Sequence, residues 1–298
     1  MKVVIPVAGF GSRMLPATKA IPKELMPLVD KPLIQYVIEE CAAAGFKEII
    51  LVSHSSKSAI EDHFDTQFEL ENSLQEKGKD EILAEVKATL PPGIEVISVR
   101  QHYAKGLGHA VLCAKRVIGD RGFAVVLPDV LMDQYACNLR RDNMAQMRTR
   151  YKETGLSQVM LEEVPKDKVS AYGIADLKGA DLHKGSFTQV HSFVEKPAIE
   201  KAPSNLAVVG RYIFSPAIWG KLEQVGVGAG NEIQLTDAMD MLLRDEDIEA
   251  YSMVGKSHDC GNKTGYAKAF VEYAYKHATL GSEIKEHIKQ LESVNPER

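Results

Sequence analysis

The sequence predicts an α/β fold, in which helices flank a mixed, mainly parallel sheet. Near the N-terminus a strand, a helix and a second strand follow one another, which is the order of a parallel βαβ unit. Two aliphatic runs, at residues 48–53 and 123–127, lack the alternation of half-exposed strands and are typical of strands covered on both faces. After about Ser157 the segments shorten, which predicts an elaborated second half built onto the first.

The first half contains three predicted strands, a helix and an insertion. Residues 2–7 form the first short apolar strand, and a glycine-bearing loop follows it. Residues 32–44 place apolar side chains at helical spacing, with Pro32 suited to the first turn and Gly45 to the position just past the end. Residues 66–90 are rich in Glu and Lys, and we expect them to form an exposed helical insertion that a Pro-Pro-Gly sequence closes.

The second half alternates strand-like and helical patterns. Strand-like segments at 159–164, 172–176, 187–195 and 207–214 are separated by Gly, Pro and Lys, which predicts mixed or antiparallel pairing. Helical periodicity follows at 232–243, 266–280 and 283–292, and in the middle segment Tyr266, Phe270, Tyr273 and His277 share a face. Repeats and low-complexity tracts are absent from the sequence, so we expect one continuous body.

Composition excludes several classes of protein. The 298 residues carry 36 Lys and Arg against 41 Asp and Glu, a net charge of −5, so the chain lacks the basic footprint of a nucleic-acid binder. The apolar runs fall far short of the roughly 20 residues that a membrane helix needs. Four scattered cysteines form neither a zinc-site nor a disulfide pattern, and nothing in the sequence marks export. We therefore expect a cytoplasmic protein with reduced thiols and neither nucleic-acid nor membrane partners.

The loop after the first strand is the most informative stretch. Gly9 and Gly11 let backbone N–H groups approach phosphates, because no Cβ stands in the way. Arg13, Lys19 and Lys23 follow closely, and we expect all three to face the mouth of the loop, where a triphosphate would sit. A tight connection with surface lysines fits the glycines equally well.

Two common phosphate-binding motifs do not fit this loop. The dinucleotide fingerprint needs a third glycine where this chain has Met14, and it needs a helix to start at once, whereas Pro16 and Pro22 keep the segment irregular. The P-loop needs Gly-Lys-Ser/Thr, but Gly11 is followed by Ser12. An oxidoreductase and a P-loop enzyme are therefore both disfavoured.

The motif Gly-x-Gly-Ser-Arg-Met-x-Pro at residues 9–16, followed by Pro-Lys at 22–23 and Lys-Pro at 31–32, resembles the signature loop of sugar-1-phosphate nucleotidyltransferases. Six more blocks, in family order, resemble bacterial UTP–glucose-1-phosphate uridylyltransferases: residues 106–110, 127–129, 171–173, 194–197, 231–237 and 258–261. The resemblance runs from residue 3 to about residue 280. One block alone would be weak evidence, but ordered matches over this span are highly specific.

The resemblance implies a single nucleotidyltransferase domain over residues 1–298, Rossmann-like and GT-A-like. It implies a nucleotide-binding half at about 1–135, a sugar-binding half at about 150–265 and C-terminal helices at about 266–298. The implied reaction transfers UMP from UTP to glucose 1-phosphate, giving UDP-glucose and pyrophosphate, in a homodimer or homotetramer. A thymidylyltransferase on a sugar 1-phosphate is the alternative within the class. A non-catalytic nucleotide-sugar-binding protein is the alternative outside it, although such a protein would be expected to lose Lys23, Asp129 or Lys196, and all three are present.

For the nucleotide, the family pattern implies contacts from Ala8, Gly9, Gly11, Gln101, Gly106 and Asp129. The side-chain amide of Gln101 offers both a donor and an acceptor to an imide edge, which suits uracil or thymine better than adenine. Gln101 also fits a surface position after the strand at 94–100. Asp129 follows the apolar strand at 123–127, at the strand end where ligand sites of open α/β sheets lie. A carboxylate there suits Mg²⁺, and the resemblance makes Asp259 a second metal ligand, although each also fits a plain turn.

For the sugar phosphate, the resemblance implies that Lys196 grips the phosphate, Glu195 accepts hydrogen bonds from hydroxyl groups and Gly173 brings the backbone to the sugar. Neighbouring residues of a strand point to opposite faces, so the joint role of Glu195 and Lys196 requires a bend, which Pro197 makes plausible. A solvated ion pair at a strand end is the alternative. For catalysis we expect Arg13 and Lys23 to stabilise the leaving pyrophosphate and Lys196 to hold the attacking phosphate, without a covalent intermediate.

Two further features receive no role in chemistry. His109 lies within a matching block, but the sequence gives it no chemical function. Asn231 with Gln234 three residues later resembles a helix cap, so residues 232–237 are interpreted as structural.

Overall fold

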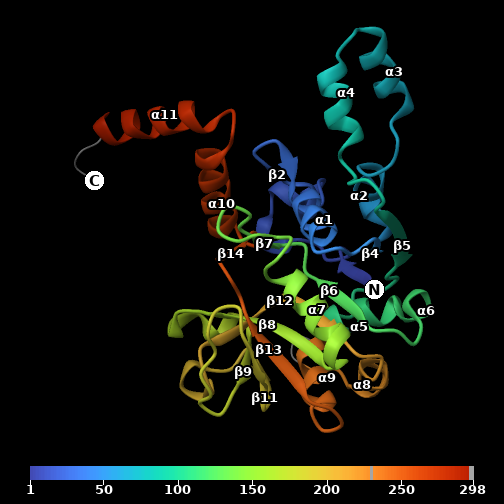
Figure 1. The fold of residues 1–298 in the computed structure, drawn as a ribbon, viewed down its shortest axis with the longest axis vertical. Coiled ribbons are helices and arrows are strands. Elements are labelled where there is room, and N and C mark those ends of the chain that lie inside the picture. Colours follow the sequence, from blue (N-terminus) through green and yellow to red (C-terminus); the bar gives the residue numbers. More distant parts are fainter. Residues whose placement is uncertain (229–230, 295–298) are drawn as a thin grey trace.

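A computed structural model describes residues 1–228 and 231–294 (Figure 1). The strands are β1 Lys2–Pro6, β2 Pro27–Leu28, β3 Lys31–Pro32, β4 Glu48–Ser53, β5 Glu95–Arg100, β6 Phe123–Val126, β7 Val130–Met132, β8 Ser157–Glu163, β9 Gly173–Asp176, β10 Phe187–Gln189, β11 Ser192–Glu195, β12 Leu206–Phe214, β13 Ile248–Ser252 and β14 Ser257–Asp259. The α-helices are α1 Leu33–Ala43, α2 Ser58–Asp62, α3 Phe68–Glu76, α4 Asp80–Lys87, α5 Leu107–Cys113, α6 Lys115–Ile118, α7 Met144–Thr154, α8 Ile218–Gln224, α9 Leu235–Leu242, α10 Lys263–Lys276 and α11 Gly281–Val294.

One sheet runs through both halves of the chain. Its strand order is β10-β13-β8-β12-β6-β1-β4-β5, and β9 joins it through β12 and carries β11. Six of the eight strands on this path point the same way, whereas β12 and β10 run against them. The mixed, mainly parallel sheet predicted from the sequence is therefore confirmed. Because β12 pairs with β6, the second half joins the first edge to edge within the same sheet.

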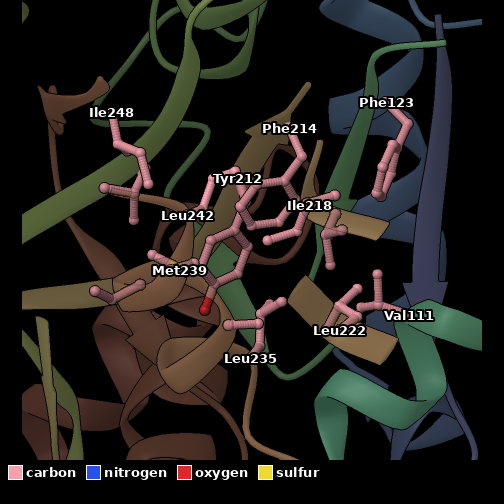
Figure 2. Packing of buried hydrophobic residues seen from close by; sticks show 14 of the residues in the cluster. Val111, Phe123, Tyr212, Phe214, Ile218, Leu222, Leu235, Met239, Leu242 and Ile248 are labelled. Atoms are coloured by element: carbon pink, nitrogen blue, oxygen red, sulfur yellow. The ribbon is translucent and has the colours of Figure 1, made fainter. Parts of the chain in front are cut away.

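The sheet is covered on both faces, as its unalternating aliphatic strands require. Along β1, Val4 belongs to one apolar cluster while Val3 and Ile5 belong to the other. Figure 2 shows the first cluster, in which side chains of α8 and α9 pack beneath the strand residues Phe123 and Phe214. Helices α1 and α7 supply the second cluster from the opposite face.

Two helical segments extend beyond the sheet (Figure 1). The predicted insertion forms the hairpin of α3 and α4, and most of its side chains are exposed. At the other end, α10 packs on β14 and leads into α11, which projects away from the sheet. Within the described ranges, no helix is long and apolar enough to cross a membrane.

Two expectations about elements need correction. The single strand expected over 187–195 is two short strands, β10 and β11, which pair with different neighbours. The helix expected over 232–243 begins only at Leu235, so its N-cap position is Gln234 and not Asn231. On the shared face expected for α10, Tyr273 is buried and Phe270 is 39% exposed. Residues 295–298 of the expected C-terminal region lie outside the described residues.

Candidate active site

Two cavities adjoin at the carboxyl ends of β1 and β6. The first, of about 500 Å³, lies between the loop after β1 and the start of α5. The second, of about 440 Å³, lies over β12 between the end of β11 and β14. Four residues line both cavities: Arg13, Leu107, Leu127 and Asp129. Ligands in the two cavities would therefore meet at Asp129, as expected for an open α/β sheet whose sites lie beyond the strand ends.

The first cavity contains most of the residues expected to bind nucleotide. Ala8, Gly9, Gln101 and Gly106 line it, together with Asp129. Gly11 does not line it, and its φ of 67° instead turns the loop, with its carbonyl accepting a hydrogen bond from Thr18 Oγ1 at 2.8 Å. At Gly11 the loop therefore changes direction, and this residue shapes the loop without lining the cavity.

The three basic residues of the loop do not all face one cavity. Arg13 and Lys23 line the first cavity. Lys19 lines a separate hollow beside Ile21 and Lys57, so the expectation that all three cations share the loop mouth is wrong. The short turns between residues 12 and 25 redirect the chain between these lysines, which spacing in the sequence does not reveal.

A compact charge cluster lies where the cavities join. Lys23 Nζ is 2.6 Å from Asp129 Oδ2, and Arg13 Nη2 is 3.5 Å from the same oxygen. Burial alone would raise the pKa of Asp129, but the neighbouring Lys23 and Arg13 leave it below its ordinary value. Burial would likewise lower the pKa of Lys23, and Asp129 outweighs that effect and raises it. Both groups therefore remain charged at neutral pH.

Glu24 is a residue of this cavity that sequence reasoning missed. It lines the first cavity, is only 1% exposed and pairs with Lys57 Nζ at 2.8 Å. Its Oε1 is buried without a hydrogen-bond partner among the described residues. Burial raises the pKa of Glu24 and lowers that of Lys57, each effect being opposed by the other partner's charge. A Glu after a Pro-Lys turn carries no sequence signal of burial.

Asp129 and Asp259 converge on Gly261. A Cβ at Gly261 would lie within 2.7 Å of Asp129 Oδ2 and 3.1 Å of Asp259 Oδ1, so a larger residue would fill the space between the carboxylates. Asp259 is held by the backbone N–H of Gly261 and by Asn262 Nδ2, each at 2.9 Å. Two oxygen donors beside cavities of this kind fit the preference of Mg²⁺ for carboxylates.

The second cavity brings together the residues expected to hold the sugar phosphate. Lys196 directly follows β11 and has a φ of 46°. This left-handed turn lets its Nζ approach Glu195 Oε1 at 2.9 Å. The required bend is therefore present, at Lys196 itself. Glu195 Oε2 also accepts a hydrogen bond from Thr236 Oγ1 at 2.8 Å. Gly173 lies against both side chains, and a Cβ there would come within 3.0 Å of Thr236 Oγ1 and 3.2 Å of Glu195 Oε2.

The segment before α9 and the first turn of α9 belong to the cavity walls, which the sequence interpretation missed. Glu232 lines the first cavity, while Gln234, Leu235 and Thr236 line the second. This segment was interpreted as purely structural because its Asn and Gln resemble a helix cap. The signal that could have found it was its membership in the ordered family blocks.

A buried ion pair fixes the turn that carries Asp129. Arg211 of β12 and Glu40 of α1 are 0% and 2% exposed, and two guanidinium nitrogens contact the two carboxylate oxygens at 2.9 and 2.7 Å. Arg211 also donates to the carbonyl of Leu127 at 3.2 Å and to that of Val130 at 2.7 Å. The Asp129 carbonyl accepts from Cys260 N at 2.8 Å, so the turn is tied on both sides.

The side-chain amide of Gln101 is oriented by its surroundings. Its Nε2 lies 3.2 Å from the Gly106 carbonyl and 2.9 Å from His109 Nδ1. An amide nitrogen has two N–H donors, and with the His109 proton on Nε2 these two acceptors occupy both. The carbonyl oxygen of Gln101 then remains for a ligand, and the expectation that the amide also offers a donor to a base stays a prediction.

The fold and the paired cavities at the strand ends are those of a nucleotide-transferring enzyme. The family model described as "Nucleotidyl transferase" matches residues 2–276, and this chain belongs to that family.

The more specific likeness is to bacterial UTP–glucose-1-phosphate uridylyltransferases. The enzyme of that name from Haemophilus influenzae is 57% identical over 291 residues, which cover 98% of this chain and 99% of that protein. The structure of UTP-bound UGPase from Acinetobacter baumannii superposes with a TM-score of 0.90 at 46% identity, covering 97% of this chain and 99% of that one. A UDP-glucose pyrophosphorylase complexed with UDP-glucose superposes with a TM-score of 0.80 at 40% identity, covering 93% of this chain and 99% of that one.

Proposed function

We propose that this protein transfers UMP from UTP to α-D-glucose 1-phosphate, giving UDP-glucose and pyrophosphate. The observation that carries the proposal is the pair of cavities joined at Asp129, with Arg13, Lys23 and Lys196 around them. One cavity would hold the triphosphate and the other the sugar phosphate. Relatives whose chains match this one almost end to end are named for this reaction or solved with its nucleotide or product.

The reaction is an in-line displacement at the α-phosphorus. A phosphate oxygen of glucose 1-phosphate forms the new bond to phosphorus, and the bond from phosphorus to the bridging oxygen of pyrophosphate breaks. The attacking oxygen is already an anion, so no proton has to be removed from it. The main barriers are repulsion between two anions and the charge that develops on pyrophosphate, which positioned cations reduce.

The residues divide between the two reactants. Arg13 and Lys23, beside the loop after β1, stabilise the leaving pyrophosphate, and Lys196 holds the attacking phosphate against Glu195 and the sugar. Asp129 and Asp259 are the residues that would hold Mg²⁺. When bound, the ion supplies a Lewis acid that offsets phosphate charge.

One assay tests this function. The protein is incubated with Mg²⁺, glucose 1-phosphate and each of ATP, GTP, CTP, UTP and dTTP, and released pyrophosphate is measured. UTP should react fastest, with some reaction of dTTP because a single methyl group discriminates by only about 1–3 kcal/mol. A clear preference for dTTP would favour a thymidylyltransferase, and no pyrophosphate with any nucleotide would leave a nucleotide-sugar-binding protein.

We also infer a homodimer or homotetramer in the cytoplasm. Several apolar side chains of α10, α11 and the link between them are at least 39% exposed, which suits an interface between copies: Phe270, Val271, Tyr275, Leu280 and Leu291. All four cysteines are free, consistent with a reducing compartment. Light scattering after gel filtration tests the oligomer, and a mass of 32.8 kDa in solution would contradict it.

A further inference from the structure

The proposed reaction gives His109 no role, yet its ring lies against Gln101, which lines the first cavity. It lies on α5, and its Nδ1 is 2.9 Å from Gln101 Nε2. Burial and the nearby Lys105 lower the pKa of His109, which favours the neutral ring at physiological pH. A neutral ring with its proton on Nε2 presents Nδ1 as an acceptor.

The backbone supplies a second acceptor to the same amide nitrogen. Gln101 N donates to the Ser53 carbonyl at 2.9 Å, which fixes the residue at the end of β5. The carbonyl of Gly106 then lies 3.2 Å from the side-chain nitrogen. If the amide were turned over, its oxygen would face that carbonyl oxygen and, with the His109 proton on Nε2, the lone pair of His109 Nδ1, so both contacts would become repulsive. Gln101 is 5% exposed and has little room for another rotamer.

Gly106 also keeps this arrangement compact. Its φ of 95° lies in the region that favours glycine, and a Cβ there would lie 2.6 Å from Glu232 Cβ and 2.9 Å from the Ile233 carbonyl. Gly108 N donates to the Ile233 carbonyl at 2.8 Å. The start of α5, and with it His109, is therefore fixed against the segment that closes the nucleotide cavity.

We propose that His109 is a positioning residue that sets the base specificity of the site by holding the Gln101 amide with its oxygen directed to the nucleotide. A fixed carbonyl oxygen accepts a hydrogen bond from the N3–H of uracil or thymine. Cytosine carries an unprotonated N3 at the same place, so two acceptors would face each other. The arrangement selects pyrimidines with an imide N–H and rejects CTP. This proposal for His109 rests on the proposed function, because Gln101 contacts a base only if the nucleotide occupies the first cavity.

The test is the ratio of kcat/KM for UTP to that for CTP, measured by pyrophosphate release. His109→Leu removes the acceptor while keeping an apolar body, and it should lower the ratio at least tenfold. His109→Asn can return an acceptor near the Nδ1 position and should restore most of the ratio. His102→Leu is the matched control, since His102 is an exposed neighbour outside the cavity lining, and its ratio should equal that of the wild type.

A wild-type ratio in a folded His109→Leu variant would overturn the proposal, and so would equal losses in the leucine and asparagine variants. Thermal unfolding shows whether each variant folds, and His109→Ala replaces the leucine variant if leucine does not fit. These outcomes are distinct from failure of the proposed function, which would appear as a wild-type protein that does not use UTP.

Discussion

Lys196 adopts a backbone conformation that lysine rarely takes. Its φ of 46° bends the chain directly after β11, and its ammonium group then reaches the second cavity beside Glu195. Non-glycine residues in this region store about 1–3 kcal/mol of strain, which the surrounding structure has to offset. Such strain is consistent with a functional requirement for the Lys196 side chain in the second cavity.

Lys196→Ala should lower kcat/KM by about a hundredfold, equivalent to about 3 kcal/mol, because it removes one positioned cation from the transition state. The measurement is steady-state kinetics with UTP and glucose 1-phosphate. Lys201→Ala, which changes an exposed lysine in the turn Ile199–Lys201 outside the cavity lining, is the control and should behave as the wild type. A near-normal kcat/KM in Lys196→Ala would remove this residue from the mechanism.

Asp129→Ala should abolish turnover supported by Mg²⁺, since this carboxylate is the one that lies between the two cavities. The substitution also leaves Lys23, whose side chain is 17% exposed, without its 2.6 Å partner. Activity is measured as a function of Mg²⁺ concentration, with circular dichroism to confirm folding. If the variant still saturated normally with Mg²⁺, Asp129 would not be a ligand.

At the scale of elements, the turn between β6 and β7 depends on a side chain from another strand. Arg211 of β12 donates to carbonyls on both sides of Asp129, and Glu40 of α1 neutralises it. A buried arginine usually contributes little net stability, because loss of hydration offsets its attraction to a carboxylate. Its contacts indicate that it orders the turn that carries the site.

A double variant separates the contribution of the Arg211–Glu40 pair to stability from its role in ordering the turn that carries Asp129. Glu40→Leu alone should destabilise the protein by about 3–5 kcal/mol, because Arg211 would be left buried and unpaired. Adding Arg211→Met replaces the pair with apolar side chains and should recover most of the free energy of unfolding in urea. The recovered protein should still lose at least tenfold in kcat/KM, because the carbonyls beside Asp129 have lost their donor. Full recovery of both quantities would contradict the positioning role.

Regular elements were predictable from the sequence, whereas the irregular segments between them were not. The run at 48–53 has the bounds of β4, since an uninterrupted aliphatic segment has few alternatives to a buried strand. The role of the segment before α9 was not predicted, because the Asn231 and Gln234 pattern also fits a helix cap. Only its tertiary contacts with Gly106 and Gly108 place this segment in the wall of the cavities. The buried state of Glu24 and Arg211 likewise depends on partners distant in sequence.

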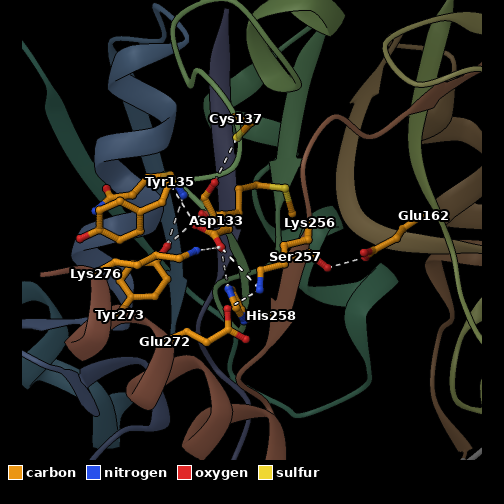
Figure 3. A network of polar contacts seen from close by, with 12 residues as sticks. Asp133, Tyr135, Cys137, Glu162, Lys256, Ser257, His258, Glu272, Tyr273 and Lys276 are labelled. Carbon is orange, nitrogen blue, oxygen red and sulfur yellow. Dashed lines mark hydrogen bonds and ion pairs between the residues drawn. The ribbon is translucent and has the colours of Figure 1, made fainter. Parts of the chain in front are cut away.

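At the scale of the whole molecule, the site lies where the two halves of the sheet meet, and α10 packs on the short strand β14 beside it. The short β14 carries Asp259 toward the cavities, while its neighbour His258 points to the other side, into the network of Asp133 (Figure 3). Alternation along a strand therefore lets one short segment serve both the site and the anchoring of the C-terminal region. The resemblance implied the first role but not the second.

Asp133 is the centre of that anchor. It is 0% exposed, its Oδ2 lies 3.1 Å from Lys276 Nζ of α10 and 3.4 Å from His258 Nε2, and its Oδ1 accepts from Tyr135 N at 2.8 Å. Lys256 approaches within 3.8 Å and also pairs with Glu272 of α10. Two carboxylates and one imidazole of this group, those of Asp133, Glu272 and His258, lie close enough together to ligate a metal, but the ammonium groups of Lys256 and Lys276 beside Asp133 oppose a cation.

Asp133→Asn should weaken the attachment of α10 to β7 and β14 and lower the free energy of unfolding by about 1.5–3 kcal/mol, the range for a hydrogen bond to a charged group.

Burial tends to raise the pKa of Asp133, but its hydrogen bonds from Tyr135 N and Lys276 leave it below the ordinary 3.8. A lowered carboxyl pKa contributes stability that is complete above the ordinary value and is lost as the pH falls through the folded-state value. The difference between wild type and variant should thus be constant from pH 7 to about pH 5 and shrink below about pH 4. Denaturant unfolding across this range measures it, with Asp65→Asn, which changes an exposed aspartate between α2 and α3, as the control. A difference that stayed undiminished well below pH 4 would show that the charge of Asp133 does not hold the anchor, and the anchor would have to be assigned to Tyr273 and its contact with the Met132 carbonyl instead.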